Sequence, residues 1–191
     1  MKRCFLLLLL VCLTCLARAQ EQRLVDPLRA LLACPLGDGL KITAVDRVVA
    51  GTTRRLVDTA AGKAAVSIAD GYRVMLATEQ GAPFVKLMLE QSAPGQLDAD
   101  RATIFAQLNS FSSRYGASTR FLKTGNQRGV EEIYFDFSEV GEQAPSGITT
   151  LIAPDKNVVA TVYLLSRQEG ARAKAAHAAL IAALTSCLAR N

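Results

Sequence analysis

The positions of five cysteines constrain this chain more than any other feature of its sequence. Cys4, Cys12 and Cys15 lie within the first 20 residues, whereas Cys34 and Cys187 lie near the two ends of the remaining chain. If the segment that holds the first group is removed, only the second group can restrain the folded domain.

The first 19 residues have the pattern of a secretion signal. Lys2 and Arg3 supply positive charge, and residues 5–16 form an apolar run that is short for a membrane span. Small residues occupy the positions that a signal peptidase reads before Gln20. We therefore predict a cleaved signal peptide over residues 1–19 and a periplasmic or secreted product.

Two other interpretations of this segment stay open: a retained membrane anchor, and a lipoprotein with its lipid on Cys12 or Cys15. Cleavage would leave one domain over residues 20–191, about 172 residues and enough for a sizeable core. It would also remove three basic residues and lower the net charge from +5 to +2. Nucleic acid is then not an expected partner, because binding it requires a concentrated basic face. We expect no transmembrane segment after cleavage.

The two remaining cysteines most simply pair with each other in an exported chain. We expect a Cys34–Cys187 disulfide, with free buried thiols and a redox-active or metal-binding pair as the alternatives. No CxxC spacing is present, and neither cysteine has a histidine close to it in the sequence.

Hydrophobic spacing predicts the elements of the first half. Helices are expected over Leu24–Cys34 and Asp98–Tyr115, and strands over Lys41–Val49, Ala64–Ala69, Tyr72–Thr78 and Phe84–Gln91. Asp70-Gly71 is a strong hairpin signal between the second and third of these strands. Simple alternation places Ile42 and Ala44 on one face of the first strand, and Thr43 and Val45 on the other. The segment Gly51–Gly62 is expected to be an irregular strand or a loop.

The second half is predicted to form two hairpins followed by a helix. The hairpins pair Thr119–Thr124 with Val130–Ser138 around Gly125-Asn126, and Ile148–Ala153 with Val158–Leu165; the helix covers Gly170–Arg190. No strand–helix–strand alternation occurs. The chain is therefore expected to form an α+β domain with a mainly antiparallel sheet of about six to eight strands, a central helix, a C-terminal helix and a short N-terminal helix.

Few residues suggest catalysis. His177 is the only histidine and lies in the alanine-rich last helix, where we expect a partly exposed side chain. Glu131, Glu132 and Asp136 on one strand, with Asp98 and Asp100 at a helix start, could serve a small exported hydrolase; a solvated strand face and helix capping by Asp98 are expected instead. We expect no catalytic residues, no cofactor and no metal site.

Four basic residues lie near the junction between the central helix and the second-half hairpins: Arg114, Arg120, Lys123 and Arg128. They could form a surface for an anion or an acidic partner. A scattered basic surface is the alternative.

The stretch from Ala64 to Leu188 resembles the PsbP-like superfamily, small α+β domains that include DcrB-like periplasmic proteins. The resemblance rests on residues 66–68 leading to Gly71-Tyr72, the helix at Ala99–Tyr115, the strand from Gly129 to Phe135, the hairpin around Asp155 and the closing Leu184-Thr185-Ser186-Cys187. It implies a mostly non-enzymatic family. We therefore expect an exported, non-catalytic binding or cell-envelope accessory protein, with a protein of the cell envelope as a candidate partner.

Overall fold

The computed structural model describes residues 28–37, 39–49, 54–59, 62–67, 70–115, 120–136, 146–165 and 171–190. Of these it describes the backbone alone for 54–59, 62–67, 107–115, 120–124, 136 and 171–173. The predicted signal peptide over residues 1–19 and the first turn of the predicted Leu24–Cys34 helix lie outside the described residues.

Seven strands form one antiparallel sheet. Their order across the sheet is β1-β4-β5-β9-β8-β7-β6. The bounds in that order are Leu40–Val48, Asp70–Thr78, Pro83–Gln91, Val158–Leu164, Gly147–Ala153, Val130–Asp136 and Arg120–Gln127. Every neighbouring pair is antiparallel. The predicted α+β class with a mainly antiparallel sheet is confirmed.

The hairpin predicted around Asp70-Gly71 is wrong. Strand β3 (Gly62–Ser67) pairs with β2 (Arg54–Thr59) in a separate two-stranded ribbon, and β4 already begins at Asp70. Gly71 is paired on both sides within the large sheet, opposite Val48 and Glu90. A Cβ on Gly71 would lie 1.9 Å from the carbonyl oxygen of Leu89. The glycine therefore permits a close approach between two strands rather than a reversal of the chain.

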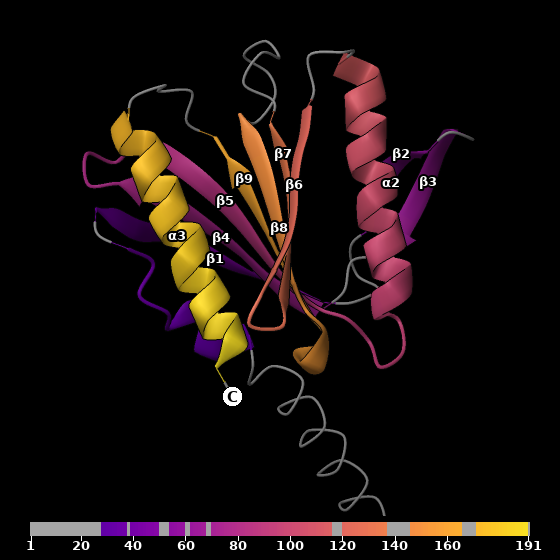
Figure 1. The fold of residues 1–191 in the computed structure, drawn as a ribbon, viewed down its shortest axis with the longest axis horizontal. Helices are drawn as coiled ribbons and strands as arrows, with labels where there is room; N and C mark the ends of the chain where they lie inside the picture. Colours follow the sequence, from indigo (N-terminus) through magenta and orange to yellow (C-terminus); the bar gives the residue numbers. More distant parts are fainter. Residues whose placement is uncertain are drawn as a thin grey trace, which may run out of the picture.

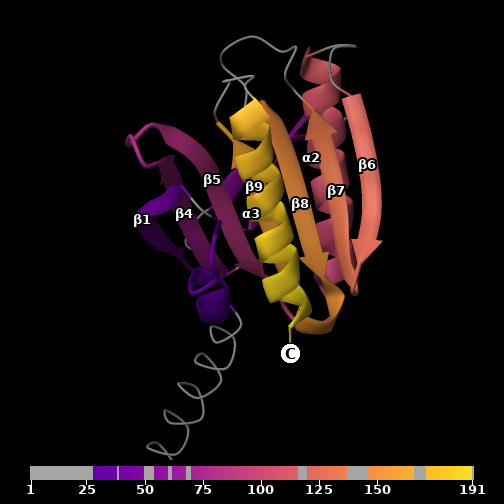
Figure 2. The same ribbon diagram turned by 60° about the vertical axis from the view of Figure 1, so that its left-hand side comes forward.

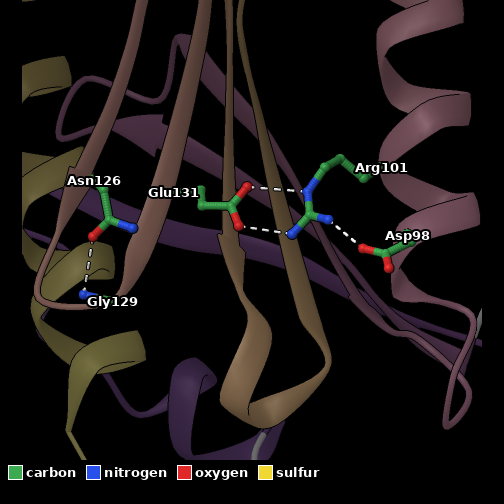
Figure 3. A network of polar contacts seen from close by, with 5 residues as sticks. All are labelled: Asp98, Arg101, Asn126, Gly129 and Glu131. Atoms are coloured by element: carbon green, nitrogen blue, oxygen red, sulfur yellow. Dashed lines mark hydrogen bonds and ion pairs between the residues drawn. The ribbon is translucent and has the colours of Figure 1, made fainter.

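The β6–β7 hairpin also turns later than predicted. Its two loop residues are Arg128 and Gly129, with φ of 54° and 81°, whereas Gly125 and Asn126 belong to β6. Two successive positive φ values are typical of the tight turns that match strand twist. The Gly129 amide donates to Asn126 Oδ1 at 3.2 Å, which supports the turn (Figure 3). The β8–β9 hairpin forms as predicted, through the short helix η2 (Pro154–Lys156).

One long helix covers each face of the large sheet. Helix α3 (Ala171–Ala189) lies on one face and α2 (Leu97–Tyr115) on the other, with β2–β3 beside α2 (Figures 1 and 2). On the α3 side, Leu180, Leu184 and Leu188 are buried against inward residues of β4, β5, β8 and β9. On the α2 side, Ile104 and Phe105 pack on a smaller cluster that includes Ile133 and Ile152.

The ends of the described domain are joined covalently. A disulfide links Cys34 to Cys187, with Cα atoms 6.4 Å apart and a sequence separation of 153 residues. Cys34 follows a helical segment at residues 28–32, whose Leu28 and Leu31 are buried in the α3-side core. The predicted pairing is confirmed, and it ties this segment to the last turn of α3.

Candidate functional site

Strand β1 forms one edge of the large sheet, and seven of its nine residues are exposed. It pairs with β4 on one side, and no described strand pairs with its other side (Figure 2). Ile42 is 41% exposed, Val45 45% and Val49, just after the strand, 42%. An edge strand that carries exposed β-branched side chains is a template for another strand.

A β-bulge changes which β1 side chains share a face. The register with β4 shifts between Ile42 and Ala44, so that Thr43 is an extra residue. Ile42 lies opposite Leu76 and Val45 opposite Val74, and both of these partners belong to the α3-side core. Ile42 and Val45 therefore lie on the same face, and the simple alternation predicted for Lys41–Val49 is wrong.

The same bulge brings two opposite charges onto the other face of β1. Lys41 lies opposite Ala77 and Asp46 opposite Arg73, and both partners point toward the α2 side of the sheet. Both side chains are exposed. The edge thus presents two apolar side chains on one face and a cation and an anion on the other.

Two side-chain hydrogen bonds hold β1 in this conformation. Thr43 Oγ1 donates to the Met75 carbonyl at 3.2 Å, directly at the bulge. Lys41 Nζ donates to the Glu79 carbonyl at 3.2 Å, in the turn after β4. The bulge is therefore a fixed feature of the strand, although Lys41 keeps further donors for another acceptor.

A second group of polar residues lies between α3 and β7. The ring of His177 lies 6.3 Å from the ring of Tyr134, tilted by 42°. The histidine side chain is half-buried as a whole, but its Nε2 is enclosed, with no hydrogen-bond partner among the described residues. Burial lowers the pKa of His177, because the charged imidazolium loses hydration there. The surroundings therefore favour the neutral imidazole.

Arg101 connects α2 to the sheet. Its guanidinium donates to both oxygens of Glu131 in β7, at 3.0 Å from Nε and 2.7 Å from Nη2, and it also binds Asp98 (Figure 3). The hydrogen bond with Glu131 raises the pKa of Arg101. Helix α2 begins at Leu97, so Asp98 lies within its first turn and binds a side chain; the predicted N-cap role is wrong.

The four predicted basic residues lie at different places along the chain's path. Arg114 is in the last turn of α2 and Arg120 begins β6. Lys123 lies within β6, and Arg128 lies in the turn at the far end of that strand, roughly 26 Å from Arg120 for extended backbone. Arg128 is exposed. The backbone therefore places Arg114 and Arg120 toward one end of β6 and Arg128 at the other.

Neither the bulged edge nor the contact of the histidine could be predicted from local sequence patterns. The β-branched residues of β1 were visible, but their exposure depends on β1 being the outermost strand. The contact between His177 and Tyr134 joins elements that are distant in sequence. Pairing of residues far apart, rather than any local motif, creates both features.

Neither a metal cluster nor a membrane-spanning helix occurs in the described part of the chain. Its residues include no group of three or more His, Cys, Asp or Glu side chains placed to hold a metal ion. None of its helices combines the length and the apolar character needed to cross a membrane.

Comparison with known proteins adds no relative: no family model, no curated protein and no solved structure matches this chain.

Proposed function

We propose that this chain is an exported, non-catalytic accessory protein that binds an extended polypeptide segment at the β1 edge. The observation that carries the proposal is the exposure of Ile42 and Val45 on an outermost strand with no described neighbour. An added strand would extend the sheet at this edge and cover these side chains. The Cys34–Cys187 disulfide supports an oxidising compartment.

The resemblance to the PsbP-like superfamily supports the same proposal. Under that assignment, the antiparallel sheet with a helix on each face would be the scaffold of a mostly non-enzymatic family. The candidate partner is then a protein of the cell envelope, since both proteins would meet after export.

A small hydrolase that uses acidic residues is the alternative, and the ion pairs of Arg101 weaken it. Glu131 accepts two hydrogen bonds from Arg101, and Asp98 binds the same guanidinium. A general acid or base must bring a carboxyl oxygen within hydrogen-bond reach of its substrate, whereas both oxygens of Glu131 and one oxygen of Asp98 already contact the Arg101 guanidinium. These two carboxylates are therefore better suited to holding α2 on the sheet.

The binding edge can be tested with a library of ten-residue peptides that alternate apolar and polar side chains. Peptides that bind should shift the amide NMR signals of β1 and its neighbour β4. Val45→Lys should weaken their binding about tenfold, because a charge at the edge opposes strand addition. Leu165→Lys is the matched control, since Leu165 is also an exposed apolar residue, 37% accessible, but follows β9. Shifts confined to other elements, or equal losses in both variants, would contradict the proposal.

Export can be tested separately, by mass spectrometry of the protein recovered from a bacterial periplasm or culture medium. We expect a mature N-terminus at Gln20. An intact Met1 in membrane fractions would show a retained anchor, and lipid on Cys12 or Cys15 would show a lipoprotein.

A further inference from the structure

We infer that the strand added at the β1 edge is β1 of a second copy of this chain, in antiparallel orientation. The inference rests on the proposed binding role of this edge and names its occupant. The two-fold axis passes between Thr43 and Ala44. Each β1 residue of one copy then lies opposite a β1 residue of the other copy, and the two residue numbers in every such pair add up to 87. This register is favoured by the way the bulge distributes side chains over the two faces.

In a regular strand, this register would be impossible. Directly opposed residues of an antiparallel pair lie on the same face of the sheet, and side chains alternate along each strand. Residues 42 and 45 would then point to opposite faces and could not be partners. The extra residue Thr43 removes this conflict, because Ile42 and Val45 both lie on the α3 side.

Neighbouring registers are less suitable. In the register whose paired residue numbers add up to 88, Ile42 on the α3 side would lie opposite Asp46 on the α2 side. A sum of 89 would oppose Ala44 to Val45, which also lie on different faces. The register with a sum of 85 would pair residues that lie on the same face, as the register with a sum of 87 does. It would place Lys41 opposite Ala44, however, and leave the cation without a carboxylate opposite it.

The register with a sum of 87 is complementary in chemistry as well as in geometry. It places Ile42 of each copy against Val45 of the other, so that four exposed β-branched side chains cover one another. It also places Lys41 of each copy against Asp46 of the other, on the α2 side. Asp46 has Arg73 opposite it within its own sheet, and a carboxylate has enough acceptor sites for both cations.

The contact joins two copies of the chain and does not continue to a third. A two-fold interface uses the same surface on both copies, so the two seven-stranded sheets would form one continuous sheet that ends at β6 on both sides. A strand-to-strand contact of this kind is small, and we expect a dimer that dissociates on dilution.

The decisive experiment is a charge swap followed by sedimentation over a series of concentrations. Lys41→Asp or Asp46→Lys alone should each weaken the dimer about tenfold, because each variant opposes like charges at two places. The double variant Lys41→Asp/Asp46→Lys should restore the affinity to within about threefold, because the pairs re-form with reversed polarity. Leu165→Lys, outside the contact, should leave the affinity unchanged.

A second measurement does not depend on the folding of any variant. A synthetic peptide with the sequence of residues 39–49 should compete with the wild-type dimer and shift the amide signals of β1. A wild-type chain that stays monomeric while library peptides still bind β1 would overturn this inference and leave the proposed function standing. A monomer with no peptide binding at β1 would overturn both. A dimer that is indifferent to the charge swap would place the contact elsewhere and overturn the inference alone.

Discussion

At the scale of single residues, Arg101 links α2 to the sheet through a pair of hydrogen bonds to Glu131. Its side chain is 27% exposed and that of Glu131 31%, so both charges are partly removed from solvent. The fork of Arg101 matches the two carboxylate oxygens, which is the strongest geometry for such a pair. Removing the guanidinium would leave Glu131 half-buried without this partner.

We therefore predict that Arg101→Met lowers the free energy of unfolding by about 1–2 kcal/mol. Arg101→Lys should recover less than half of this loss, because an ammonium group keeps the charge but cannot form the fork. Urea denaturation measures the stability of both variants. Wild type, Arg101→Met, Glu131→Gln and the double variant Arg101→Met/Glu131→Gln together form a double-mutant cycle. Additive losses in that cycle would show that the pair does not contribute as a unit.

His177 gives a prediction about pH. Its pKa is lowered in the folded protein by burial, whereas the unfolded chain has the ordinary value of about 6.5. The unfolded state thus binds a proton more readily, so this contribution to stability is present above that value and is lost as the pH falls through the folded pKa. His177→Gln should lose less stability than wild type between about pH 7.5 and 5.5.

Two measurements check the His177 prediction. Urea denaturation at the two pH values compares the variant with the wild type, and NMR follows the titration directly, since the chain has one histidine. A folded-state pKa at or above the ordinary value would contradict the assignment of burial as the cause.

At the scale of elements, the turn of the β6–β7 hairpin offers a stabilising substitution. Arg128 adopts φ of 54°, a left-handed conformation that asparagine tolerates better than arginine, and Gly129 follows it. Arg128→Asn should raise the free energy of unfolding by about 0.5–1 kcal/mol, measured by urea denaturation. Arg128→Val is the opposite control, because a β-branched residue fits this conformation poorly. An Asn variant no more stable than the Val variant would show that the turn conformation is not what decides stability there.

The same scale shows where sequence patterns succeed and fail. The β8–β9 hairpin and the two long helices follow from local spacing, because their loop residues and apolar periods act over neighbouring positions. The prediction of a hairpin turn at Asp70-Gly71 was wrong because the same dipeptide that favours a tight turn also permits two strands to approach closely. The prediction of a turn at Gly125-Asn126 was wrong because the turn forms at Arg128-Gly129, and no local preference of arginine predicts a turn there.

Strand β1 shows a deeper limit. Its period of two correctly indicates a strand. The extra residue Thr43 interrupts this period, so that the side chains after Thr43 lie on the opposite faces from those that simple alternation from Lys41 predicts. A bulge of this kind depends on the register with β4, which lies far along the chain. The candidate site could therefore be recognised only after the strands were paired, even though each of its residues was visible in the sequence.

At the scale of the whole molecule, the fold class follows from element order. Strands grouped on either side of one helix exclude the alternation that parallel sheets require, and the observed sheet is antiparallel throughout. The order of the strands could not be predicted in the same way. β9 lies between β5 and β8, so the two groups of strands join in the middle of the sheet, and α3 covers that junction (Figure 2).

The Cys34–Cys187 disulfide acts on this whole arrangement. Its sequence separation of 153 residues spans every described strand of both sheets. In the chain-entropy model a loop of that length stabilises the folded state by about 5 kcal/mol, through the unfolded state. We predict that Cys34→Ala/Cys187→Ala unfolds at lower urea concentration, with a loss of about 2–5 kcal/mol. Oxidised wild type should show a Cys34–Cys187 crosslink in non-reducing mass spectrometry.

The same pair of alanine substitutions separates two effects of the bond. Cys34 is itself buried beside Leu28 and Leu31, so part of the loss could come from packing at the end of the helical segment. Reduction of the wild-type protein removes the bond and keeps the sulfur atoms in place. If the crosslink matters because it limits the unfolded chain, reduced wild type and the double alanine variant should lose similar stability. A reduced protein as stable as the oxidised one would assign the loss to packing, and the disulfide would then be a mark of the compartment rather than a source of stability.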